Sequence, residues 1–493
     1  MNIRIAARSA QQGSIILISL FVAAIAGVAL ASYLILTETQ NVSIYRSQAW
    51  NTALTVTEAG IEDALQLVNR YAGSFEPDDL PKWTNHTAES NWQSLGGGLY
   101  YVKRYIPVPT SGGAWQTNSY EVWVTNIANE PKIYATATVP WTFQYASAPQ
   151  AMFAMIGGNA TVISTEGSTA SSLPPVRRDV YVKTKLDPLF AVAMAAVDVI
   201  DLMGNNIQTD SFDSADPNFS NGGFYPYGQI WKTKANGDVC TDRALINSLN
   251  VGNANIKGHV RTGPGVNTIT IGPNGSVGDR AWVEGGRKGI QPGRSGTDFN
   301  VVFPDVVLPA KPWLPVVKDT KTIDGVSYDY VFADSGTRYY RIDSTIKGNV
   351  LVNAPADAIV NILITTSVKL TSQVIRIANT GAKVRVYMAG SQFSLSGNGW
   401  IDNQSGIAER FYLFGLPTCT SITLGGNSQF YGGVYAPNAD YTLGGGGNDT
   451  WDFVGASVTR TVKMNGHFNF HFDENLARIG PGRGYIPVSW NER

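Results

Sequence analysis

The stretch that decides the architecture is IILISLFVAAIAGVALASYLIL, residues 15–36, which is almost wholly apolar. No charged residue occurs between Ser9 and Thr37. A helix needs about 20 apolar residues to cross the hydrocarbon core of a bilayer. Arg4 and Arg8 precede the run, which places the amino terminus in the cytoplasm and the body of the chain outside it. The membrane helix is expected to include Ile15, Ile16, Leu17, Ile18, Leu20, Phe21 and Val22.

Two alternatives compete with a membrane helix. A buried helix of a soluble core is one, but such helices rarely lack a polar face. A cleaved signal peptide is the other, although its apolar run is shorter and ends at a small-residue cleavage site. Here the helical pattern instead continues beyond residue 36, with no proline before Pro77. Apolar or small residues recur in steps of three or four at Val42, Tyr45, Ala49, Ala53, Val56, Gly60, Ala64 and Leu67.

This stripe predicts one helix from about Ser14 to Asn69, roughly 84 Å long. The wider segment assigned to the helix is residues 14–72, and residues 1–13 form a hydrophilic leader. A rod of this length exceeds what a simple anchor requires, so its outer half is expected to pack on another part of the chain.

Composition excludes several classes of protein. The chain has 493 residues, of which only 15% are charged, and a formal net charge of −1. A disordered polyelectrolyte is therefore excluded. Neither a basic excess nor a local Lys/Arg cluster is present to neutralise phosphates, so no nucleic acid is expected as a partner. The length suggests two to four domains.

The beginning of the chain resembles a known family. The leader MNIRIAARSAQQG ends in Gly13, QQGSIILISLF follows from residue 11, and TEAGIEDAL occupies residues 57–65. In this order the segments resemble the N-terminal region of PilX-type minor pilins and of the related pseudopilins of type II secretion. The resemblance covers about the first 70 residues.

The resemblance implies cleavage after Gly13 by a prepilin peptidase, which would leave Ser14 as a methylated first residue. The helix would stay in the inner membrane until it joins other pilin subunits in a filament. One position departs from the family pattern. Major pilins usually carry Glu at the fifth mature position, where this chain has Ile18. The difference favours a minor component over a repeating shaft subunit.

The region 73–190 is expected to form a small antiparallel sheet on the exported half of the helix. A polar linker over 73–92 precedes strand-like runs rich in Tyr, Val, Trp and Thr. These runs lie at 99–107, 120–127, 132–143 and 179–186. The apolar segment 190–200 is expected to be a buried strand or a short helix leading into the next domain.

The region 191–480 alternates short apolar runs with Gly and Asn, which favours stacked rungs of a parallel β-solenoid. A large antiparallel sandwich is the alternative, because no strict repeat period exists. A proline-rich stretch near 285–343 is expected to be an insertion, and 481–493 a tail. The predicted class is α+β. Segments 432–476 and 210–217 resemble an uncharacterised solenoid domain that follows PilX-type N-termini.

Candidate chemistry is sparse, and no cofactor is expected. One face of an expected strand carries alternating polar residues, which are His467, Asn469, His471 and Asp473. They either bind a metal or form a polar ladder in the stack. A second series, Asp210, Asp213 and Asp216, is expected to cap turns rather than to bind a calcium ion. Cys240 and Cys419 either pair in an exported body or remain buried thiols. The tryptophans considered for a surface or glycan ligand, or else for the core, are Trp83, Trp92, Trp115 and Trp123.

Three functional hypotheses follow. The preferred one is a non-enzymatic minor-pilin-like subunit of a type IV pilus or secretion pseudopilus, with a solenoid head for adhesion or filament priming. Such a subunit would cross the inner membrane once, with its body outside the cytoplasm, and reach the filament or cell surface after assembly. The second is a membrane-anchored solenoid enzyme acting on polysaccharide, although no carboxylate pair stands out. The third is an envelope scaffold that polymerises through its solenoid.

Overall fold

The computed structural model describes residues 10–69, 91–109, 115–125, 130–140, 142–143, 171–172, 174–204, 206–245, 247–265, 269–425, 429–445, 451–465, 467–479 and 481–492. These residues belong to two compact units. The helix–sheet unit contains the chain up to Leu67, the described residues between 91 and 184, and residues from Pro487 onward. The stacked unit contains Val68, Asn69 and residues 185–486. The expected linker over 73–92 lies almost wholly outside the described residues.

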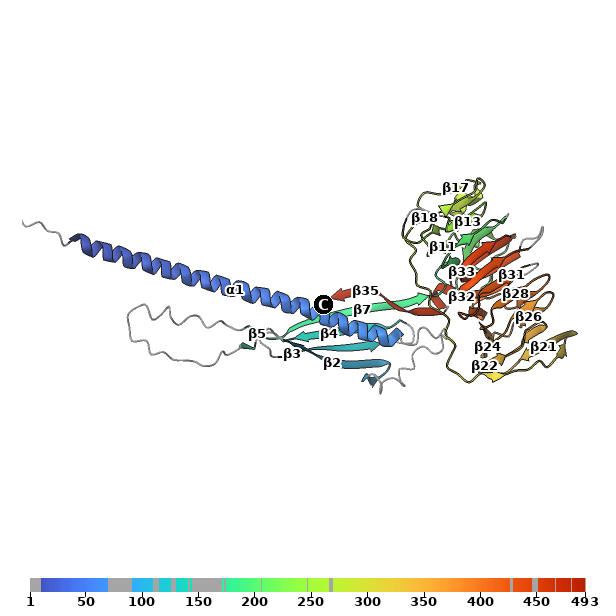
Figure 1. Cartoon of the computed structure of the whole chain (residues 1–493), viewed down its shortest axis with the longest axis horizontal. Coiled ribbons are helices and arrows are strands. Elements are labelled where there is room, and N and C mark those ends of the chain that lie inside the picture. The colour runs from blue at the N-terminus through green and yellow to red at the C-terminus, as the bar shows by residue number, and fades with distance from the viewer. Residues whose placement is uncertain are drawn as a thin grey trace, which may run out of the picture. The chain divides into compact units, whose positions relative to one another are not determined.

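One uninterrupted helix, α1 (Ala10–Asn69), forms the beginning of the described chain (Figure 1). Its 60 residues correspond to about 90 Å. The expected helix is confirmed, and it ends at Asn69, two residues after Leu67, the last residue of the apolar stripe. Within the helix–sheet unit the stripe is buried from Ala49 to Leu67, whereas Tyr45 remains 50% exposed.

The helix–sheet unit contains most of a sheet of six strands in the order β1-β2-β3-β4-β7-β35. Their bounds are β1 (Gln93–Gly96), β2 (Leu99–Pro109), β3 (Trp115–Thr125), β4 (Lys132–Val139), β7 (Val176–Pro188) and β35 (Gly482–Glu492). The pairings from β1 through β7 are all antiparallel. The small antiparallel sheet expected from the Tyr-, Val- and Thr-rich runs is therefore present.

α1 lies close to one face of this sheet because a glycine faces it. A methyl group added at Gly60 would lie 2.9 Å from Val122 and 3.0 Å from Tyr120. Beside this contact, Asp63 accepts hydrogen bonds from Arg104 Nε (2.6 Å) and from the Tyr120 hydroxyl (3.0 Å). The even-numbered residues of β2 and β3 therefore face the helix, and the odd-numbered residues face away from it.

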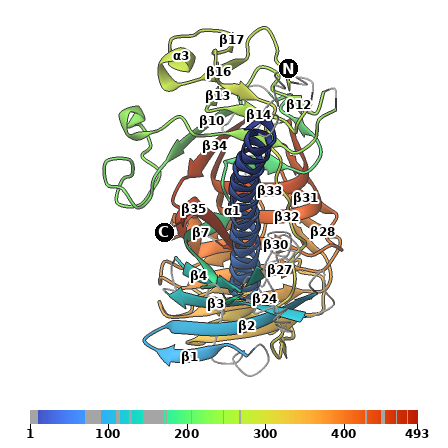
Figure 2. The same ribbon diagram turned by 90° about the vertical axis from the view of Figure 1, so that its left-hand side faces the viewer.

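Strands of the stacked unit are labelled in Figure 2, and the long ladders among them pair in parallel. One ladder joins β22 (Thr337–Ile342), β24 (Ile359–Ile364), β27 (Lys383–Met388), β30 (Phe411–Gly415), β32 (Phe430–Leu443) and β33 (Trp451–Met464). It continues through β8 (Met194–Ala196), β11 (Val239–Thr241), β14 (Val260–Arg261) and β18 (Ser295–Gly296). The parallel pairing of these strands differs from the antiparallel pairing of a sandwich, which was the alternative that the sequence allowed. The segment 190–200 contributes buried strands, β8 and β9 (Ile200–Asp201).

The order of strands in the stack differs from their order in the chain. The first arm, residues 194–296, runs from β8 outward to β18. The second arm, residues 314–479, begins at the opposite end with β19 (Leu314–Pro315) and returns until β33 pairs with β8. The last strand, β34 (Phe468–Asp473), pairs with β10 (Gln208–Phe212). We call this junction of the two arms the seam.

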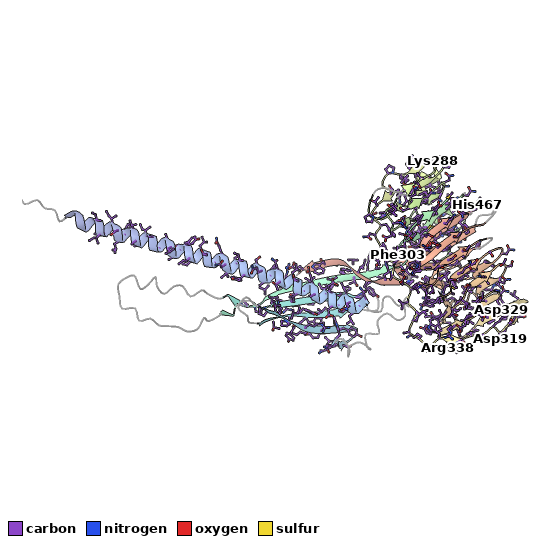
Figure 3. All side chains as sticks on the ribbon, viewed as in Figure 1. Lys288, Phe303, Asp319, Asp329, Arg338 and His467 are labelled. Carbon is purple, nitrogen blue, oxygen red and sulfur yellow. The ribbon has the colours of Figure 1, made fainter. Side chains whose placement is uncertain are left out.

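The two arms share one apolar core. Inside the second arm, Phe430 stacks on Phe453 (4.7 Å between ring centroids), and Phe453 stacks on Phe470 (4.2 Å). The ends of the stack carry polar side chains, including Lys288 at one end and Asp319, Asp329 and Arg338 at the other (Figure 3). Polar side chains at the two ends of a stack of strands keep it from extending by edge pairing.

Two boundaries differ from expectation. The C-terminal stretch expected as a tail is the strand β35, which lies next to β7 in the sheet. Pro481 and Pro487 obscure it in the sequence, but a proline is tolerated at an edge strand. The expected insertion near 285–343 is only partly irregular. Its second half contains β20 (Lys321–Ile323), β21 (Val326–Phe332) and β22, which pair within the stack or at its end.

Candidate functional site

The apolar half of α1, residues 15–36, is exposed around its whole circumference. Ile15, Ile16, Leu17, Ile18, Leu20, Phe21 and Val22 are between 58% and 70% exposed. These 22 residues span about 33 Å, close to the roughly 30 Å hydrocarbon core of a bilayer. By length and composition the helix is able to cross a membrane, and none of its most apolar window is buried.

The expected processing position lies within α1. The backbone at Gly13 and Ser14 is helical, and their side chains lie outside the described residues, as does the leader up to Ser9. The apolar half therefore begins directly after the expected cleavage point. An apolar surface this large requires lipid or other apolar helices around it.

A buried charged cluster of the stacked unit lies at the seam, where β34 pairs with β10 and places His471 opposite Asp210. His471 Nδ1 lies 2.6 Å from Asp210 Oδ1, and Nε2 lies 3.4 Å from Asp452 Oδ1 on β33. The Tyr225 ring stacks on the imidazole at 3.6 Å, and its hydroxyl donates to Asp210 Oδ2 at 2.8 Å. The cluster thus joins three neighbouring strands and one loop.

Charge balance determines what this cluster can do. Burial alone would lower the pKa of His471, but the carboxylates of Asp210 and Asp452 outweigh burial and raise it to about 9. The pKa of Asp452 is lowered, because the opposing effect of burial is outweighed by its hydrogen bond to His471. Both ring nitrogens therefore carry protons at neutral pH, and neither has a free lone pair for a metal or for proton abstraction.

The same seam holds further ion pairs between the arms. Arg478 bonds to Asp213, and Lys234 bonds to Glu474. Glu474 also accepts a hydrogen bond from Ser211 (2.8 Å), and Asp473 accepts one from the backbone of Ser214 (3.1 Å). Each of these contacts joins the end of the second arm to the beginning of the first.

The candidate metal residues do not meet in one site. His467 contacts Asn206 (3.3 Å) instead of His471, and Asn469 donates to Asp452 (3.1 Å). Asp216 accepts from the backbone of Asn218, which caps a turn. Within the described residues no group of three or more His, Cys, Asp or Glu side chains is arranged to hold a metal ion.

The remaining candidates take separate positions. Cys240 and Cys419 are both buried and both free, so the thiol alternative fits this structure. Trp92 is 2% exposed, and Trp123 is partly exposed on the sheet face away from α1. Trp83 and the side chain of Trp115 lie outside the described residues.

Sequence reasoning missed Asp452 and Tyr225, which complete the seam cluster. Asp452 follows a Gly-rich run, and Tyr225 lies in the loop between β10 and β11. No local spacing connects either residue to His471. The sequence singled out His471 and the Asp210 series separately. Because His471 and Asp210 lie 261 residues apart in the chain, nothing in the sequence connected them.

Comparisons with known proteins cover the chain unevenly. Residues 316–479 match the model of a domain of unknown function, DUF7305. The match begins directly after β19 and ends with α4 (Leu476–Ile479), so it coincides with the second arm. No curated protein matches the chain. The crystal structure of the competence-associated pilin ComZ from Thermus thermophilus aligns over 90% of this chain and 97% of that chain, at 9% identity and a TM-score of 0.23. At that TM-score the alignment carries no argument about the fold.

Proposed function

We propose that the chain is a non-enzymatic, PilX-like minor pilin subunit of a type IV pilus or secretion pseudopilus. A prepilin peptidase removes residues 1–13, and Ser14 becomes the methylated first residue. The apolar half of α1 then holds the subunit in the inner membrane. It later leaves the lipid to pack with the helices of other pilin subunits.

The observation that carries this proposal is the single helix α1 with two different surfaces. Its first half is apolar and exposed on every side, and its second half is buried on an antiparallel sheet. An ordinary signal peptide would not continue as a helix of the folded body. Ile18 supports a minor position, because its apolar side chain cannot pair with the terminal amine of a neighbouring subunit.

The stacked unit is proposed to be a β-solenoid that the subunit presents outside the cytoplasm, for adhesion or filament priming. Its parallel ladders and continuous apolar core support this description. The protonated imidazole of His471 favours a structural role for the seam over catalysis. Incubation of the full-length protein with a panel of polysaccharides is expected to yield no product, and cleavage of any of them would overturn the non-enzymatic role.

The processing step is tested by mass analysis of the mature N-terminus. The membrane-extracted protein is expected to begin at Ser14. Gly13→Ala is expected to retain the leader and remain in the membrane fraction. Gly27→Ala is the matched control, because a methyl group at Gly27 meets no atom within 4 Å. A wild-type protein that starts at Met1, or beyond about residue 30, contradicts the proposal.

A further inference from the structure

The face of the sheet opposite α1 carries a row of aromatic side chains. Strand register aligns Tyr101 with Trp123, Trp123 with Tyr134, and Tyr134 with Tyr181. The ring centroids of Tyr101 and Trp123 are 5.2 Å apart, and those of Trp123 and Tyr134 are 5.4 Å apart. Four strands at about 4.8 Å spacing give a row of about 14 Å. All four side chains are partly exposed.

A polar row runs parallel to the aromatic one, two residues away from it on each of the four antiparallel strands. Lys103 pairs with Glu121 (2.9 Å), and Thr136 donates to Asp179 (2.6 Å). Arg177, on the same face, pairs with Asp179 (3.3 Å). The charges in this row balance one another, so it offers hydrogen-bond donors and acceptors without net charge.

The opposite flank of the aromatic row is cationic. Lys132 lies directly opposite Lys183 in the register, and both side chains are exposed. Each lies two residues from an aromatic of the row, Tyr134 or Tyr181, and therefore on the same face. Two neighbouring ammonium groups attract an anion to this side of the row.

One end of the aromatic row opens into a cleft of about 430 Å³. Its walls come from Asn91, Trp92, Gln93, Tyr101 and Lys103. A volume of this size, with an aromatic wall and a few polar groups, is typical of a small-ligand site. Tyr101 belongs to both the cleft and the row, so the two form one continuous surface.

We propose that this surface binds an acidic polysaccharide. The negative faces of the rings attract the weakly positive C–H groups of pyranose rings. The neutral row bonds sugar hydroxyls, and Lys132 and Lys183 take the carboxylates of uronic acid units. The polar row offers hydrogen-bond partners for several hydroxyl groups per sugar unit, whereas single-stranded DNA has no free hydroxyl along its backbone and fits less well. The proposed binding surface lies on the sheet of the helix–sheet unit. The proposal does not require α1 to enter a membrane or a filament.

The test measures binding of the detergent-solubilised full-length chain to immobilised alginate, a polyuronate, with dextran and oligothymidylate as comparison probes. Wild-type protein is expected to bind alginate, to bind dextran more weakly, and to lose alginate affinity as salt rises. Trp123→Ala is expected to weaken alginate binding at least about tenfold, equivalent to 1.4 kcal/mol. Trp123→Phe, which keeps a ring, is expected to restore most of the affinity.

Matched controls lie in the stacked unit. Trp231→Ala removes an aromatic that is 64% exposed there, and Lys288→Gln removes an exposed lysine (Figure 3). Both are expected to leave alginate binding unchanged, whereas Lys132→Gln is expected to weaken it and reduce its salt dependence. Unchanged thermal unfolding of each variant shows that the fold is kept. No alginate binding, equal loss in the controls, or stronger binding of oligothymidylate would each overturn the proposal.

Discussion

The two halves of α1 belong to one helix but have opposite surroundings. Residues 15–36 are apolar on all sides and exposed on all sides. From Ala49 to Leu67 the apolar residues form one stripe, and the sheet covers it. The comparison shows that the breadth of an apolar surface indicates its partner. A stripe is satisfied by one sheet within the same chain, whereas a fully apolar surface needs lipid or several helices from other chains.

A single arginine placed in each half is expected to give the largest and most different effects. Ala53 is fully buried on the sheet, so Ala53→Arg buries an unpaired charge and costs more than about 4 kcal/mol of folding free energy. Leu20→Arg leaves the folded body unchanged but costs up to about 3 kcal/mol in the bilayer, which is the cost for a residue at the centre of the span. Thermal unfolding and the membrane-bound fraction measure the two effects.

The result that would break the comparison is a reversal of these phenotypes. If Leu20→Arg lowered the unfolding temperature as much as Ala53→Arg, the apolar half would be part of the folded core. If Ala53→Arg alone released the protein from membranes, the second half would be the anchor.

The stability of the folded body is expected to depend on pH, whereas membrane binding by the apolar half is not, because residues 15–36 contain no charged residue. The pKa of His471 is about 9 when folded and about 6.5 when unfolded, so its stabilisation is complete below pH 6.5 and is lost as pH rises through 9. The loss is on the order of 3 kcal/mol. Denaturant unfolding at pH 6 and pH 10 measures it, while membrane retention stays constant over the same range.

Two histidine variants show whether the loss of stability at alkaline pH comes from the seam or from other groups in the chain. His471→Gln is expected to abolish most of the pH dependence and to destabilise the stacked unit at pH 6. His467→Gln, which changes the histidine near the surface beside Asn206, is expected to behave like wild type. Equal pH dependence in wild type and His471→Gln would contradict the role assigned to the seam.

The same glycine-to-alanine change in each half is expected to give the smallest effect, with opposite signs. At Gly60 the added methyl meets Val122 at 2.9 Å and Tyr120 at 3.0 Å, so Gly60→Ala costs about 1–3 kcal/mol. At Gly27 nothing lies within 4 Å, so Gly27→Ala stabilises the helix by up to about 1 kcal/mol. Urea unfolding of the detergent-solubilised protein measures both, and equal effects at the two sites would contradict the close contact of α1 with the sheet.

Periodicity along the chain predicted much of the helix–sheet unit. The stripe that ends at Leu67 predicted the end of α1, and the Tyr- and Val-rich runs predicted β2, β3, β4 and β7. These elements are visible because each is continuous in sequence and each buries one face. β35 was not predicted, because Pro487 interrupts its pattern and its partner β7 lies about 300 residues earlier.

The seam shows the limit of that reasoning. The sequence singled out both His471 and Asp210, but in two separate candidate metal sites. Only the pairing of β34 with β10 places them 2.6 Å apart. The pairing of the last strand of the stack with the beginning of its first arm leaves no trace in local spacing, because it depends on the length and route of every intervening turn.

The central claim is that the apolar half of α1 is surrounded by lipid or by other helices, while the packed half stands outside them. Cysteine labelling in intact cells tests it directly, since Cys240 and Cys419 are fully buried and do not compete for the reagent. With a water-soluble maleimide, Gln66→Cys is expected to label and Ala24→Cys to stay protected until detergent is added. Equal labelling of Ala24→Cys and Gln66→Cys before detergent would contradict the account.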